Sequence, residues 1–76
     1  MISAKLKGII LESLELDDWD LEDGTTASMV PGWDSLSHAR IIATVENAYG
    51  LRFETREILR LRTLGQLQEL VDGKVP

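Results

Sequence analysis

Apolar residues recur at three- and four-residue steps in three stretches of the chain, which is the spacing of amphipathic helices. The first stretch predicts a helix over residues 3–15, the second a helix over residues 35–49, and the third a helix over residues 64–72. No run alternates apolar and polar residues as a half-buried strand would. The pattern therefore predicts an all-α fold.

The first predicted helix carries one apolar stripe. Its members are Ile2, Leu6, Ile9, Ile10 and Leu14. Ser3 is suited to cap this helix, because its hydroxyl can accept a hydrogen bond from a free backbone N–H of the first turn. Gly8 weakens the helix slightly, since glycine has a low helix propensity.

The second predicted helix has two contrasting faces, and Gly50 is suited to end it. Its inward stripe consists of Ile41, Ile42, Val45, Ala48 and Tyr49. Its opposite face consists of Leu36, Arg40, Ala43 and Asn47, with Ala39 and Glu46 on the flank. This opposite face is small, mostly uncharged and contains an exposed leucine, so it is either bare surface or a docking surface for another protein.

A short helix is predicted over residues 56–61, after an extended segment at residues 51–54. Thr55 is suited to cap the short helix and Thr63 to cap the last one. The short helix carries Ile58, Leu59 and Leu61, and the last helix points Leu64, Leu67, Leu70 and Val71 inward. Three main helices and one short helix make a small four-helix bundle.

A long connection, residues 16–34, joins the first two helices and is rich in Asp, Gly, Thr and Ser. Connections of this length in compact domains are usually functional or packed on themselves. Its apolar residues, which we expect to pack it against the helices, are Trp19, Leu21, Met29 and Val30. The segment has room for a short helical turn and crosses between antiparallel helices.

The 76 residues are enough for one domain, residues 1–76, with one small core. The net charge is −5, and residues 17–34 hold six acidic and no basic residues. This balance argues against nucleic acid as a partner, because affinity for nucleic acid rests on basic contacts. The acidic loop either attracts basic partner surfaces or keeps a small protein soluble, and we favour the second interpretation.

The chain has no cysteine, so it can form neither a disulfide framework nor a thiolate metal site. Any thiol chemistry must come from a cofactor. No apolar run approaches the length that spans a membrane, and the first residues lack the apolar centre of a signal peptide. We expect a cytoplasmic protein that does not associate with membranes.

The acidic segment Asp18–Gly24 looks at first like a calcium-binding loop. With Asp18 as position one, the glycine falls at position seven instead of six, and position twelve is Met29. The bidentate glutamate of such loops is therefore missing. We predict no metal site.

The stretch Gly32–Ser37 places the hydroxyl of Ser35 at the start of a helix, beside the carboxylate of Asp34. The positive field of a helix N-terminus suits a phosphate-type anion. His38 lies one turn further on, which raises the alternative of a serine hydrolase. We discount it, because neighbours on one helix rarely form a triad and the chain is too small to enclose a substrate.

Two bulky residues flank this serine. We interpret His38 as a partly buried residue at the mouth of the bundle, with contact to a group on Ser35 as the alternative. Trp33 immediately precedes the helix and is suited to pack back on its first turn. A direct role of Trp33 in binding is the less favoured interpretation.

The whole chain resembles the acyl carrier proteins and their relatives, the peptidyl and aminoacyl carrier proteins. Asp34-Ser35-Leu36 matches their Asp-Ser-Leu attachment motif, after a long loop and at the start of the second helix. The segment Val45–Phe53 resembles the end of that helix and its following turn. The segment Thr63–Leu67 resembles the start of the family's fourth helix.

The resemblance implies that Ser35 is modified with 4′-phosphopantetheine from coenzyme A by a phosphopantetheinyl transferase. The thiol of this arm would carry an acyl or aminoacyl group as a thioester. Asp34 would lie close to the metal and the coenzyme during the transfer, with Leu36 completing the motif. The protein itself would be a monomer and not an enzyme, served by a loading ligase and downstream acyl-processing enzymes.

The predicted docking face is formed by Leu36, Ala39, Arg40, Ala43 and Glu46. Carriers of fatty acid synthesis are usually strongly acidic along this face, whereas here Arg40 and Asn47 interrupt it. The resemblance therefore leaves three alternatives: a carrier for fatty acid synthesis, a carrier for a specialised lipid or secondary-metabolite pathway, and an aminoacyl or peptidyl carrier. A helical interaction domain that is never modified is a further alternative.

Overall fold

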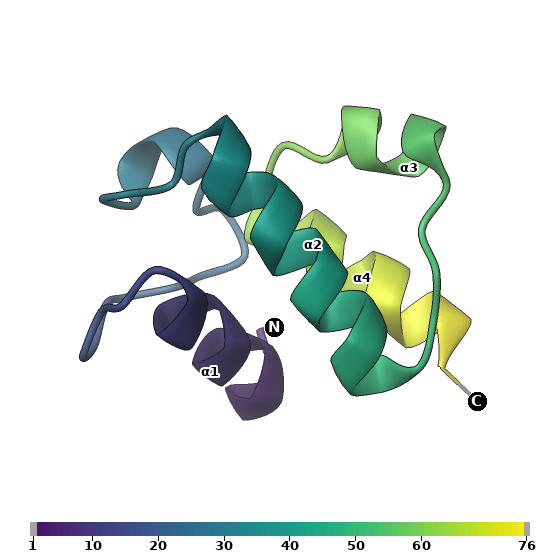
Figure 1. The fold of residues 1–76 in the computed structure, drawn as a ribbon, viewed down its shortest axis with the longest axis horizontal. Helices are drawn as coiled ribbons and strands as arrows, with labels where there is room; N and C mark the ends of the chain where they lie inside the picture. The colour runs from purple at the N-terminus through teal and green to yellow at the C-terminus, as the bar shows by residue number, and fades with distance from the viewer. Residues whose placement is uncertain (1, 76) are drawn as a thin grey trace.

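The computed structural model describes residues 2–75, which fold into four α-helices and one 3-10 turn (Figure 1). The helices are α1 (Ala4–Ser13), α2 (Ser35–Tyr49), α3 (Thr55–Arg60) and α4 (Leu64–Lys74). The 3-10 turn, η1 (Ala27–Met29), lies inside the long connection. The predicted all-α bundle with three main helices and one short helix is confirmed.

Helices α1 and α2 pack side by side in antiparallel directions (Figure 1). The Lys5 ammonium, near the start of α1, donates to the Ala48 carbonyl near the end of α2, at 3.3 Å. The hydroxyls of Ser3 and Tyr49 lie 3.5 Å apart at the same end. Helix α4 runs behind α2 in this view, and α3 lies at one edge of the molecule.

The predicted apolar stripes meet in one core. Its buried residues are Leu6, Ile10, Leu21, Val30, Ile41, Ile42, Val45, Phe53, Leu64, Leu67 and Val71. All three main helices contribute, and the long connection adds Leu21 and Val30. Within the described residues, no helix is long and apolar enough to cross a membrane.

The helix ends follow the predicted chemistry in most places. The Ser3 hydroxyl accepts from the Leu6 N–H at 3.2 Å, and the Thr63 hydroxyl accepts from the Gln66 N–H at 3.3 Å. Helix α2 ends at Gly50, whose φ of 66° lies in the left-handed region that glycine adopts without strain. Helix α1 ends at Ser13, earlier than predicted, and Glu15 takes a left-handed φ of 57° just beyond it.

The cap predicted for α3 was wrong by one residue. Glu54 is the N-cap, and Thr55 is already the first helical residue. The reason is the Glu57 carboxylate, which accepts from the Glu54 N–H at 2.8 Å and so fixes the helix start one residue earlier.

Three apolar residues that we expected to pack inward are exposed: Trp19, Met29 and Ala48. In the long connection, burial of Leu21 and Val30 leaves the side chains of Trp19 and Met29 facing water. Ala48 lies on the flank of α2 that carries the contact with Lys5. Leu59, which the sequence places on the short helix, is 79% exposed, and α3 buries none of its residues.

The long connection is tied to the start of α4 through its backbone. The Leu64 N–H donates to the Thr25 carbonyl at 2.9 Å, and the Gly65 N–H donates to the Asp23 carbonyl at 3.0 Å. These N–H groups have no partner within the helix, so the connection satisfies them. A Cβ at Gly65 would lie 2.9 Å from the Asp23 carbonyl oxygen, so the close approach depends on glycine.

One buried polar residue, Gln68, links the two ends of the fold. Its side-chain oxygen accepts from the Ser3 N–H at 2.9 Å, and its side-chain nitrogen donates to Asp72 at 2.8 Å. The amide of Gln68 is therefore paired at both atoms, as a buried polar group needs to be. It fixes the start of α1 against α4.

Candidate functional site

Ser35 is the first residue of α2, and its side chain is exposed. Asp34 is the N-cap, and its carboxylate accepts from the Ser37 N–H at 2.8 Å. The hydrogen bond from the Ser37 backbone, reinforced by the Ser37 hydroxyl, holds the pKa of Asp34 below its ordinary value. Asp34 thus presents a fixed negative charge beside the free hydroxyl of Ser35.

Trp33 and His38 form a pair across the first turn of α2. The Trp33 indole N–H donates to His38 Nδ1 at 3.1 Å, and the ring centroids lie 6.1 Å apart. The indole can only donate, so Nδ1 is the accepting atom of this bond. The interpretations of Trp33 as packed on the first turn and of His38 as partly buried are confirmed.

The same pair argues against a hydrolase. The Nδ1 atom of His38 is occupied by the indole, and the Ser35 side chain hydrogen-bonds to none of residues 2–75. A serine nucleophile needs a base within hydrogen-bond reach and a third group to orient that base. Asp34 instead caps the helix through Ser37, so Ser35, His38 and Asp34 do not form a triad here.

An open hollow of about 430 Å³ lies beside Ser35. It is lined by Ala27, Ser28, Trp33, Asp34, Ser35 and His38. The turn η1 supplies one wall and the start of α2 the other, so the long connection builds half of the hollow. An exposed hydroxyl with free space beside it fits the covalent attachment of a flexible phosphate-linked group.

Four of the five predicted docking residues are exposed on α2, namely Leu36, Ala39, Arg40 and Ala43. Leu36 is 70% exposed. Glu46 differs from them, because it is partly buried and its carboxylate accepts from the Phe53 N–H at 2.8 Å. That bond holds the turn after α2 in place, a role that the sequence pattern did not reveal.

The side chain of Arg40 lies next to the C-terminal end of α1. It lines a shallow hollow together with Glu12 and Glu15, which places two carboxylates near its charge.

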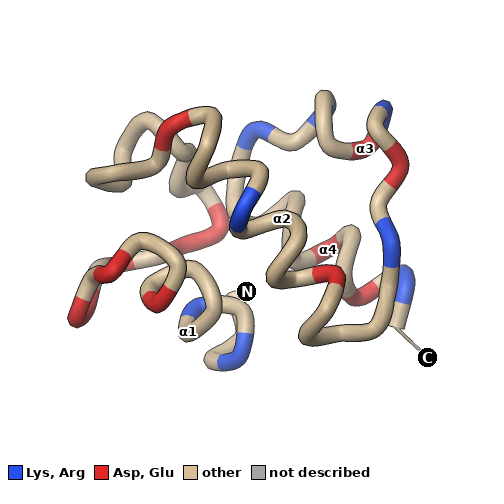
Figure 2. Tube along the Cα trace, viewed as in Figure 1, with Lys and Arg blue, Asp and Glu red and all other residues tan. Residues whose placement is uncertain are grey.

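Charge is distributed unevenly over the whole molecule. Figure 2 shows acidic positions following the end of α1 and basic positions around α3. Residues 52–62 hold four arginines and two glutamates.

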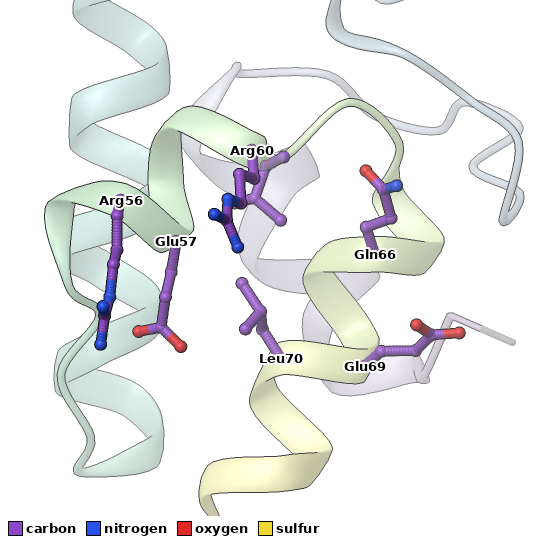
Figure 3. A pocket seen from close by; sticks show the side chains of 7 residues that line it. Arg56, Glu57, Arg60, Gln66, Glu69 and Leu70 are labelled. Atoms are coloured by element: carbon purple, nitrogen blue, oxygen red, sulfur yellow. The ribbon is translucent and has the colours of Figure 1, made fainter.

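A second hollow, of about 530 Å³, separates α3 from α4 (Figure 3). Arg56, Glu57 and Arg60 reach it from α3, and Glu69 and Leu70 reach it from α4. Two of its charges are already paired, Arg56 with Glu54 at 2.7 Å and Glu57 with Lys74 at 2.9 Å. It offers no nucleophile, so the candidate site is the hollow at Ser35.

Comparison with known proteins decides the family. The sequence model of the family described as "Phosphopantetheine attachment site" matches residues 4–71. The chain belongs to this family of carrier proteins. The carrier fold also matches the solution NMR structure of a holo acyl carrier protein from Geobacter metallireducens, with a TM-score of 0.87 and 34% sequence identity over 92% of this chain and 80% of that one. No curated protein matches the chain.

Family membership confirms the resemblance drawn from the sequence. Carriers of this family bear 4′-phosphopantetheine and are not themselves enzymes. They work with a phosphopantetheinyl transferase and with acyl-processing enzymes. The matched segment includes the whole of α2, the turn η1 and the hollow between them.

Proposed function

We propose that Ser35 bears the phosphopantetheine arm and that residues 1–76 act as a single carrier domain for acyl intermediates. The pathway would be fatty acid synthesis or a specialised lipid or secondary-metabolite route. The observation that carries the proposal is the exposed hydroxyl of Ser35, the first residue of α2, which lies beside an open hollow of about 430 Å³. An aminoacyl or peptidyl cargo is the alternative within the same chemistry.

The attachment chemistry suits this position. Ser35 Oγ would attack the phosphorus that bears the pantetheine of coenzyme A, releasing adenosine 3′,5′-bisphosphate and giving its proton to a base of the transferase. The resulting phosphodiester would lie at the N-terminus of α2, where free backbone N–H groups and the helix dipole favour an anion. The thiol of the bound arm then supplies the thioester chemistry.

An intact-mass measurement tests the proposal. The purified protein is incubated with coenzyme A, magnesium and a broad phosphopantetheinyl transferase, and the mass should rise by one phosphopantetheinyl group. Ser35→Ala should abolish the rise. Ser37→Ala is the matched control, two residues away on the same helix, and should keep it. Modification of the Ser35→Ala protein would assign the arm to another residue.

We further propose that the exposed residues Leu36, Ala39, Arg40 and Ala43, with Glu46 at their edge, meet the partner enzymes. The positive charge of Arg40 disfavours enzymes that dock carriers through basic patches, since like charges slow steered association. The loaded carrier should be a weak substrate for a malonyl transferase of fatty acid synthesis. The double variant Arg40→Glu with Asn47→Glu should improve it, most clearly at low salt. No gain at low salt would contradict this assignment.

A further inference from the structure

Two spaces in the carrier share a wall. The open hollow at Ser35 has a volume of about 430 Å³, and a smaller cavity of about 40 Å³ adjoins it. The residues that line both are Ala27, Trp33 and His38. The smaller cavity is further lined by Leu61, Leu64 and Leu67, and the last two belong to the buried core. Exposed Arg62 and half-buried Thr63 line its outer side. The Trp33–His38 pair therefore lies between Ser35 and the core leucines that line the smaller cavity.

The pair is held closed by its own hydrogen bond. Trp33 packs against the core, and its indole N–H donates to His38 at 3.1 Å. An apolar chain that entered past the two rings would separate them. The indole N–H would then lose its partner in an apolar setting, which is unfavourable for a polar group.

The interior beyond the pair has little room. A volume of about 40 Å³ holds no more than a few water molecules, since roughly 10–15 Å³ is needed for one. The rest of the core is closed to solvent, since Leu6, Ile10, Ile41, Val45 and Val71 are each 0% exposed. A longer alkyl chain would have to displace these residues.

We propose that the Trp33–His38 pair closes the bundle to the group carried on Ser35. The inference rests on Ser35 being the attachment residue. The first part of the arm lies in the open hollow against the two rings, and the carried group stays in water. A long alkyl chain would then expose its methylenes, which is unfavourable. The cargo class that fits this carrier is a short or polar acyl or aminoacyl group.

The test compares two loaded forms of the wild-type carrier, made with the transferase from acetyl-CoA and octanoyl-CoA. Intact mass comes first, because failure to load on Ser35 contradicts the proposed function and not the role of the pair. The two loaded forms should then have the same Tm. Their thioesters should be cleaved by hydroxylamine at rates within about twofold, since cleavage follows the population of the exposed form.

A sequestered chain gives the opposite result. The octanoyl thioester would be cleaved at least about tenfold more slowly than the acetyl thioester, because burial of each methylene favours the form with the chain inside the bundle. The Tm would rise with chain length, and the methyl NMR signals of Leu61, Leu64 and Leu67 would shift. Any of these results in the wild-type protein would overturn the inference.

Variants test the pair itself. Trp33→Ala removes the cover, so its octanoyl form should gain protection from hydroxylamine and a higher Tm than its acetyl form. Trp33→Phe keeps a ring but lacks the N–H. The protection of its octanoyl thioester from hydroxylamine should therefore lie between that of Trp33→Ala and that of the wild type. Trp19→Ala is the matched control, because Trp19 is exposed and lines neither space. Should Trp33→Ala fail to fold, His38→Ala breaks the same hydrogen bond. An octanoyl form that stays unprotected in the folded variants would show that the pair is not the barrier.

Discussion

The long connection before α2 and the segment around α3 both cross between main helices, but they are held in opposite ways. The connection is mostly irregular, yet it buries Leu21, Thr25 and Val30 and satisfies two N–H groups of α4. Helix α3 is regular, yet none of its residues, Thr55–Arg60, is buried. Regular hydrogen bonding within a segment is thus a poor measure of how firmly the segment is attached.

The attachment of α3 is largely polar and lies near its start. The Glu57 carboxylate accepts from the Glu54 N–H and pairs with Lys74 of α4 at 2.9 Å. Ile58 and Leu61 are only partly buried. Segments with few buried apolar contacts open at low free energy. We therefore expect α3 to open before the connection does, which leaves the wall of the hollow at Ser35 in place.

The largest effect should come from the same change made in each region. Leu21→Ala removes a leucine that is 8% exposed and should lower the free energy of unfolding by about 2–5 kcal/mol. Leu59→Ala removes a leucine that is 79% exposed and should change it by no more than about 0.5 kcal/mol. Urea unfolding followed by circular dichroism measures both. Equal costs for the two variants would contradict the comparison.

A smaller effect should come from the contact between the connection and α4. Gly65→Ala adds a Cβ that would lie 2.9 Å from the Asp23 carbonyl oxygen, so it should lower the free energy of unfolding by roughly 1–3 kcal/mol. Gly8→Ala is the matched control in α1, where a Cβ meets nothing within 4 Å. It should raise stability by about 0.5–1 kcal/mol, because alanine favours the helix. If Gly65→Ala instead raised the stability, the backbone at Asp23 would have to shift away from the added Cβ at little cost, which would contradict a firmly held connection.

The smallest effect concerns the polar attachment of α3. The Glu54 N–H, and then Lys74, hold the pKa of Glu57 below its ordinary value. Because the pKa of Glu57 is lower in the folded state, these bonds stabilise α3 at pH values above its unfolded-state pKa of about 4.3. The stabilisation is lost as the pH falls through the folded pKa.

Amide NMR signals of α3 should therefore move in acid as Glu57 becomes protonated. Glu57→Gln should remove this titration, whereas Glu12→Gln, at an exposed position of α1, should leave it unchanged. The same acid-induced movement in the Glu57→Gln protein would exclude Glu57 as the attachment of α3.

The parts of the fold that the sequence predicts well are those with a repeating pattern or a local cap. Apolar spacing and Gly50 gave both ends of α2 as the structure has them, and the caps Ser3 and Thr63 follow from hydroxyls next to each helix. The irregular connection offers no period, so nothing local distinguishes buried Leu21 from exposed Trp19. Their burial is decided by distant helices.

The candidate site divides in the same way. The motif identifies Ser35 and Asp34, because the chemistry of a helix start is local. The bond from Trp33 to His38 depends on how two rings turn toward each other, and the hollow depends on where η1 comes to lie. Neither follows from residue spacing. The buried amide of Gln68 was also missed, because its partner at Ser3 is 65 positions away.

The hydrogen bond between Ser3 and Gln68 affects when the chain can fold during its synthesis. The chain leaves the ribosome from its N-terminal end, so α1, α2 and the Ser35 motif emerge well before Gln68. Until Gln68 is out, the start of α1 lacks its partner and the core lacks the apolar face of α4. Folding of the bundle must then wait until α4 has been synthesised. A chain cut short before α4 would lack this part of the core, so we expect it to remain unfolded and open to proteolysis.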